Sequence, residues 1–77
     1  MSIQRTVLRD DDLSPDGVRV IVAWADMDIG TSVFIPCVNT VEAKKQIKDL
    51  FRHKMWRHVI RVRIENGKLG VRVWRTI

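Results

Sequence analysis

The chain has 77 residues, of which 45% are hydrophobic and 30% charged, a balance typical of one small globular domain and not of a disordered chain. No apolar run approaches the ~20 residues that span a bilayer, and the N-terminus lacks the apolar core of a signal peptide, so we expect no membrane segment. The single cysteine, Cys37, excludes an internal disulfide and favours a reducing, cytoplasmic location.

Charge is distributed unevenly along the chain. Residues 1–43 carry three basic and seven acidic side chains, whereas residues 44–77 carry eleven basic and two acidic ones, and the formal net charge is +5. This asymmetry predicts an acidic end and a strongly basic face, which favours a polyanionic partner. The alternative is a basic composition that serves only solubility.

Residues 1–16 are expected to be an acidic arm or an edge segment of the domain. The carboxylates of Asp10, Asp11 and Asp12 repel one another, and Pro15 and Gly17 interrupt any regular element. The spacing of the aspartates lacks the alternation of a calcium-binding loop, so we predict solvated turn residues and no metal site.

Two strands are predicted before the first helix. Residues 18–25 are rich in β-branched side chains and alternate, which is typical of a strand, and residues 26–31 then form a turn. The second strand covers residues 32–38. Pro36 cannot donate a backbone hydrogen bond, so it is expected at a sheet edge, a bulge or the strand end.

The sequence predicts a helix from Asn39 to about Lys54. Asn39 is a good N-cap, and Glu42 lies three residues later, as in a capping box. An apolar stripe at helical spacing, expected to pack on the sheet, comprises Ala43, Ile47, Leu50 and Phe51. Lys45 and Asp49 are expected to pair. A basic row beside the stripe comprises Lys44, Lys48 and Arg52.

The end of the chain predicts a β-hairpin. Residues 57–65 and 68–77 are typical of strands, and the Asn66-Gly67 pair between them is a strong signal for a two-residue type I′ turn. The order is then strand, strand, helix, strand, strand. We therefore predict an α+β fold, ββαββ, with an antiparallel sheet packed against one helix.

The two-residue turn fixes which hairpin residues face each other. One face is wholly apolar and is predicted to be core: Ile60, Val62, Ile64, Leu69, Val71 and Val73. The other face is basic and holds Arg57, Val59, Arg61, Arg63, Arg72 and Trp74. A Glu65–Lys68 ion pair is expected to close the basic face at the turn.

In this register Arg61 lies opposite Arg72. Like charges in a cross-strand pair destabilise a sheet by up to ~1 kcal/mol, so we expect the acidic N-terminal segment or a polyanion to cover this face. Arginines around an exposed aromatic ring fit nucleic acid, because a two-stranded ribbon enters a duplex major groove and Trp74 can stack on an unpaired base. The alternative is structural: arginine stems cover exposed strands, and Trp74 can pair with Val59 to shield the sheet.

The remaining candidates for chemistry are weak. His53 and His58 do not share a face, and Cys37 as a third zinc ligand would leave the fourth position unfilled. We expect Cys37 to be a small core residue. A Cys–His catalytic pair has no orienting acid, so we expect no enzymatic activity and no cofactor.

Two segments, Ile29–Pro36 and Gly70–Arg75, resemble a pattern in short proteins encoded by bacteriophages. These proteins carry a Gly-x-Ser-Phe/Val-Phe-Val/Ile-Pro segment, a helix, a basic strand and a terminal Val-Trp-Arg. The match covers roughly Gly30 to Arg75 and implies a protein made in an infected bacterium. The resemblance implies two classes of function, binding DNA or RNA and binding a host protein to disable it, and assigns no functional residue.

Together these features predict a nucleic-acid-binding protein, with duplex DNA as the expected ligand and regulation as one role. The residues expected to contact phosphates or bases are Arg57, Arg61, Arg63, Arg72, Trp74, Arg75, Lys44, Lys45 and Lys48. The alternative is an interaction protein that inhibits or redirects a host enzyme, such as RNA polymerase or a nuclease, through this basic face. A homodimer formed through an exposed strand is a further expectation, since so short a chain buries only ~60% of its unfolded surface.

Overall fold

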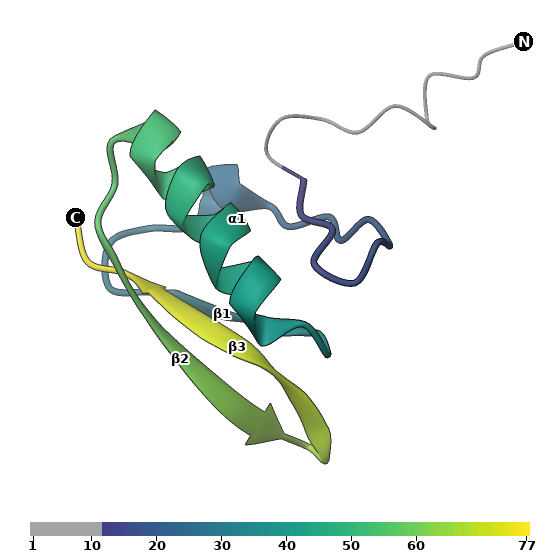
Figure 1. The fold of residues 1–77 in the computed structure, drawn as a ribbon. Coiled ribbons are helices and arrows are strands. Elements are labelled where there is room, and N and C mark those ends of the chain that lie inside the picture. Colours follow the sequence, from purple (N-terminus) through teal and green to yellow (C-terminus); the bar gives the residue numbers. More distant parts are fainter. Residues whose placement is uncertain (1–11) are drawn as a thin grey trace, which may run out of the picture.

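The computed structural model describes residues 12–77. Its elements are a 3₁₀ helix η2 (Trp24–Asp26), β1 (Ser32–Pro36), α1 (Thr40–Lys54), β2 (His58–Glu65) and β3 (Lys68–Arg75). The strands form one antiparallel sheet in the order β1-β3-β2, and α1 lies across one face of it (Figure 1). The predicted α+β fold with an antiparallel sheet against one helix is confirmed.

The hairpin of β2 and β3 has the predicted turn and register. Asn66 and Gly67 have φ angles of 52° and 75°, which a type I′ turn requires at both central positions. Arg61 lies opposite Arg72 across the two strands. Because β3 also pairs with β1, it is the central strand of the sheet.

The predicted strand over residues 18–25 is wrong, so within residues 12–77 one strand precedes the helix instead of two. The chain turns into η2 at Trp24, and Val18 and Ile21 are 71% and 69% exposed. Trp24 and Met27 are both buried. Residues three apart lie on one side of a 3₁₀ turn but on opposite sides of a strand, so burying both side chains favours the turn over the β propensity of this segment.

The segment from residue 12 to η2 lies beside α1 (Figure 1). Leu13 is buried in the core and forms an isolated antiparallel bridge with Val20. The Ser14 N–H donates to Gln46 Oε1 at 2.7 Å. The expected acidic arm is therefore packed on the helix from Asp12 onward, whereas residues 1–11 lie outside the described part of the chain.

Helix α1 covers the predicted residues, with one difference at its start. The Asn39 side chain accepts a hydrogen bond from the Glu42 N–H at 3.0 Å, as an N-cap does. The Asn39 N–H donates to Asp16 Oδ1 at 2.8 Å, so Asp16 takes the place that Glu42 would have in a capping box. Met55, with a φ of 60°, ends the helix in the left-handed conformation.

The core lies between α1 and the sheet. The predicted helix stripe of Ala43, Ile47, Leu50 and Phe51 is buried, and so are Cys37, Val71 and Val73. Phe51 is central, because the rings of Trp24 and His58 meet it edge-on at 5.5 and 5.0 Å between centroids. Burying one such large apolar side chain stabilises the fold by about 1.5–3 kcal/mol.

The prediction that the whole apolar face of the hairpin is core is wrong near the turn. Val62, Ile64 and Leu69 are exposed, Ile64 by 72%. The hairpin extends beyond the N-terminal end of α1 (Figure 1), so no helix covers this part of the sheet. Strand alternation predicts on which face each side chain lies, but it does not predict how far along the hairpin α1 covers that face.

Candidate nucleic-acid interface

The basic side chains of the hairpin lie on the face of the sheet that α1 leaves uncovered, which we call the open face. Strand alternation puts these residues opposite the buried Ile35, Val71 and Val73. From the described strands, the open face comprises Ser32, Phe34, Pro36, Val59, Arg61, Arg63, Glu65, Lys68, Gly70, Arg72 and Trp74. Arg57 precedes β2 on the same side by alternation.

Arg72 is engaged within the sheet. Its Nε and Nη2 donate to the two carboxylate oxygens of Glu65, each at 2.7 Å, and its Nη1 donates to Ser32 Oγ at 2.7 Å. These hydrogen bonds hold the pKa of the Glu65 carboxyl below its ordinary value and raise the pKa of Arg72. Arg72 therefore cross-links all three strands.

The expected Glu65–Lys68 ion pair is wrong, because Glu65 turns to the arginines instead. Besides Arg72, its carboxylate lies 3.3 Å from Arg63 Nε. Two cations now share one carboxylate on this face. A bidentate arginine pair is stronger than a single lysine contact, which explains the choice of partner.

Arg61 differs from its cross-strand neighbour Arg72. Within residues 12–77 its side chain makes no ion pair or hydrogen bond, and it is exposed. The expectation that the acidic segment covers the basic face does not hold for Asp12 and Asp16. Asp12 lies 3.7 Å from Arg19, and Asp16 binds the start of α1.

Trp74 lines an apolar hollow on the open face, which we call the Trp74 hollow. Its volume is about 430 Å³, and it is lined by Ile29, Gly30, Val59, Arg61 and residues 74–76. The turn before β1 forms one wall because the Gly30 N–H donates to the Arg75 carbonyl at 2.7 Å. Val59, directly opposite Trp74, is still 43% exposed and does not close the hollow.

Arg75 does not share this face with Arg61 and Trp74. Its guanidinium lies 3.7 Å from the ring centroid of Trp56, and its Nη1 donates to the Met27 carbonyl at 2.7 Å. The side chain is thus structural, holding the end of β3 to the loop after η2.

The predicted lysines lie on α1, across the sheet from the open face. Lys45 and Lys48 are exposed and Lys44 is partly buried. Lys48 is close enough to His58 of β2 to act on its charge. The expected Lys45–Asp49 pair is wrong, because Asp49 binds Arg52 at 2.6 Å.

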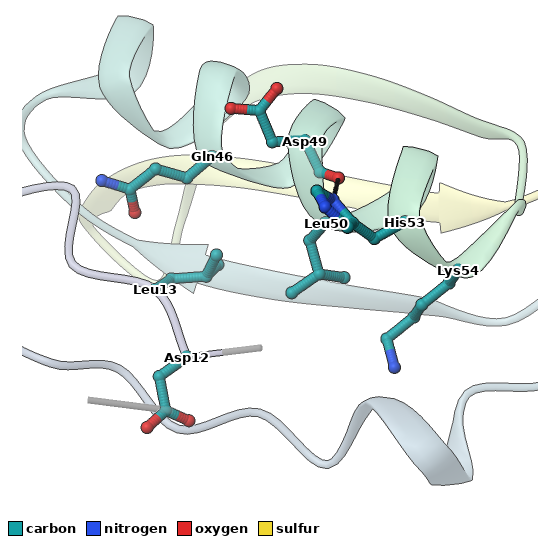
Figure 2. Close-up of a pocket in the computed structure, with 7 residues that line it drawn as sticks. All are labelled: Asp12, Leu13, Gln46, Asp49, Leu50, His53 and Lys54. Carbon is teal, nitrogen blue, oxygen red and sulfur yellow. Dashed lines mark hydrogen bonds between the residues drawn. The ribbon is translucent and has the colours of Figure 1, made fainter. Parts of the chain in front are cut away.

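A larger hollow of about 590 Å³ lies between the N-terminal segment and α1 (Figure 2). Its polar side chains already have partners: Asp12 lies near Arg19, Asp49 binds Arg52, and His53 Nδ1 bonds the Asp49 carbonyl at 2.9 Å. This leaves little free hydrogen-bonding capacity for a polar ligand.

Residues 12–77 contain no group of three or more His, Cys, Asp or Glu side chains arranged to hold a metal ion. Among the helices in this range, none has the length and apolar composition that crossing a bilayer requires.

Comparisons of the chain with protein-family models, curated proteins and solved structures found no match.

Sequence reasoning missed Phe34, Ile29 and Gly30 as parts of the open face. Phe34 joins it only because β1 pairs with β3, with Phe34 opposite Arg72. The pairing of β1 with β3, which α1 and β2 separate in the sequence, leaves no local signal in the residues of either strand. The alternation of Phe34 with the buried Ile35 was the one available hint.

Proposed function

We propose that this protein binds nucleic acid through the open face of its sheet. The observation that carries the proposal is Arg61, an arginine with no protein partner in the described chain, beside the apolar hollow at Trp74. A cation next to a half-buried, still accessible aromatic ring matches both parts of a nucleotide, since the cation can bind the phosphate and the ring can stack on the base. Arg63 on β2 and Arg57, which directly precedes this strand, extend the positive charge on either side of Arg61.

The surplus of charge supports the same ligand. Residues 44–77, which include both strands of the hairpin, carry eleven basic and two acidic side chains. Among the described strand residues of the open face, Glu65 is the one with a carboxylate side chain. Neutralising phosphates with these cations releases counterions and favours binding at low salt. A cytoplasmic location, in a bacterial host if the phage resemblance holds, belongs to this proposal.

The test is a titration of labelled DNA with the full-length protein, followed by fluorescence anisotropy at low and physiological salt. Binding that weakens steeply with salt and weakens further in Arg61→Ser is expected. Circular dichroism of the variant must show an unchanged fold. If neither DNA nor RNA raises the anisotropy at low salt, the proposal is wrong.

The second candidate is a protein-binding module, and the exposed apolar end of the hairpin favours it. Val62, Ile64 and Leu69 form an exposed apolar group on the helix side of the sheet, and such groups often mark protein interfaces. A pull-down from bacterial lysate before and after nuclease treatment separates the candidates. Captured protein that nuclease removes was tethered by nucleic acid, whereas protein that remains favours a direct partner.

A further inference from the structure

The Trp74 hollow has the size and the apolar lining to receive one flat, apolar group. Its volume of about 430 Å³ lies within the range of small-molecule sites. Trp74 is half-buried, so its edges are fixed by the sheet while part of the ring stays accessible. Ile29 and Val59, both exposed, form apolar walls on either side.

The positive charge beside the hollow indicates that the flat group belongs to a negatively charged ligand. Arg75 also borders the hollow, but its guanidinium is committed to Trp56 and the Met27 carbonyl. Arg61 is therefore the lining side chain with a free positive charge. A planar apolar group carried on a negatively charged chain satisfies both conditions, and an unpaired nucleobase on its phosphate backbone is such a group.

The shape of the sheet argues against a base that remains paired. In a duplex both faces of each internal base are stacked and cannot lie on a tryptophan. A two-stranded ribbon can enter a major groove, but here β1 flanks β3 along residues 70–74, so the hairpin is a free ribbon only near its turn. The accessible surface is a flat sheet face, the kind on which aromatic side chains stack single-stranded bases.

Phe34 offers a second stacking position. It is half-buried on β1, opposite Arg72, whose guanidinium carbon lies 5.8 Å from the Phe34 ring centroid. Ser32 faces Trp74 across the same strand pair, so the two aromatic residues are diagonal neighbours. Diagonal residues on adjacent strands are close enough for their side chains to contact the same ligand.

We infer that the Trp74 hollow binds an unpaired base, and that the ligand class is single-stranded nucleic acid. This inference rests on the proposed function and narrows it. Trp74 stacks on the base, and Arg61 contacts the adjoining phosphate. Phe34 is placed to stack on a neighbouring base of the same strand.

The experiment compares four labelled probes of equal length, about 12 nucleotides, which suits the usual site size of single-strand binders. They are oligothymidine, oligouridine, the same DNA backbone with abasic spacers, and a DNA duplex. Full-length protein is titrated into each at one low salt concentration. We expect the two base-bearing single strands to bind about ten-fold or more tighter than the abasic strand and the duplex.

Three variants assign the contacts. Trp74→Leu keeps an apolar side chain and is expected to bind the base-bearing strands no tighter than the abasic one, whereas Trp74→Phe retains most of the difference. Arg61→Gln is expected to weaken binding to the base-bearing and abasic single strands alike, because it removes a phosphate contact. Circular dichroism and thermal melting confirm that each variant is folded.

The outcomes separate this inference from the function on which it rests. Duplex bound as tightly as the single strands, or oligothymidine bound equally by Trp74→Leu and the parent, overturns the inference and leaves nucleic-acid binding standing. Failure of all four probes overturns both. A preference between oligothymidine and oligouridine identifies the strand as DNA or RNA, and either result supports the inference.

Discussion

Arg61 and Arg72 face each other across β2 and β3, yet their surroundings give them different roles. Arg72 donates to both oxygens of Glu65 and to Ser32. Arg61 has no such partner among residues 12–77. The same residue type in the same cross-strand pair therefore serves the fold at one position and is available to a ligand at the other.

Substituting each arginine separately tests this difference. Arg72→Ser should lower the melting temperature by a few degrees, because Glu65 loses its bidentate partner and the link to Ser32 is broken. Arg61→Ser should leave the melting temperature unchanged or slightly higher, since a like-charge pair is relieved. Thermal denaturation by circular dichroism measures both. Equal losses in the two variants would contradict the assignment.

His58 makes stability depend on pH. Burial against Phe51, and secondly the charge of Lys48, lower the pKa of His58 below its ordinary value. Since the folded chain holds this proton less well than the unfolded chain, protonation favours unfolding. The contribution of neutral His58 is complete above the unfolded pKa of about 6.5 and is lost as the pH falls through the lower folded value.

We therefore expect the free energy of unfolding to decrease as the pH falls below about 6.5, the ordinary histidine pKa, and to decrease less in His58→Gln, which cannot be protonated. The pKa of Glu65 is also lowered, so its contribution is lost only in more acidic solution, below the ordinary carboxyl pKa of about 4.3. Urea denaturation at several pH values measures the free energy of unfolding of the parent and of His58→Gln. Parallel pH curves for parent and variant would show that another group is responsible.

At the level of elements, the pairing of β1 with β3 depends on Gly70. A Cβ atom built there would collide with the Ile35 carbonyl oxygen and lie 2.7 Å from Phe34 Cζ and 2.8 Å from Pro36 Cα. Real Cβ atoms do not approach backbone this closely, and β1 cannot move without losing its ladder to β3. Glycine at this position lets the Phe34 ring lie over the central strand.

Gly70→Ala should accordingly destabilise the fold by about 1–3 kcal/mol, the usual cost of forcing atoms into a packed site. Urea denaturation gives the loss, and Lys68→Ala, an exposed position on the same strand, serves as the control. Nucleic-acid binding should weaken with the fold, because Phe34 and the wall at Gly30 both depend on β1. A variant as stable as the control would mean that β1 pairs differently with β3.

The sequence predicts the elements that depend on local interactions and misses those that depend on contacts between distant residues. The hairpin and α1 were predicted almost to the residue, because a two-residue turn, an N-cap and an apolar stripe are local signals. The strand over residues 18–25 was not, because the burial of Trp24 against Phe51 is a tertiary contact that outweighs local propensity. The same limit applies to the candidate site: Arg61 and Trp74 lie in the hairpin, whereas the walls at Ile29 and Gly30 come from a distant turn.

At the level of the whole molecule, the sheet separates two sets of cations. Arg61 and Arg63 on β2, and Arg57 just before it, lie toward the open face. Lys44 and Lys48 lie on α1, with Lys48 near His58. A strand bound flat on the open face reaches only the first set. A ligand that wraps around the edge at β2 would reach both.

Two double variants of equal charge distinguish these arrangements. Arg57→Ser with Arg61→Ser and Lys44→Ser with Lys48→Ser each remove two positive charges, so a purely global charge effect would be the same for both. Each lost phosphate contact reduces the slope of log affinity against log salt by about 0.7 for a single strand. The arginine pair should therefore reduce the slope by about 1.4, and the lysine pair should leave it nearly unchanged.

The measurement is a set of titrations of oligothymidine at several salt concentrations, with the fold of each variant checked by circular dichroism. Equal reductions by both pairs would contradict binding confined to the open face and place the strand around the edge of β2, where the predicted lysines of α1 would contact it.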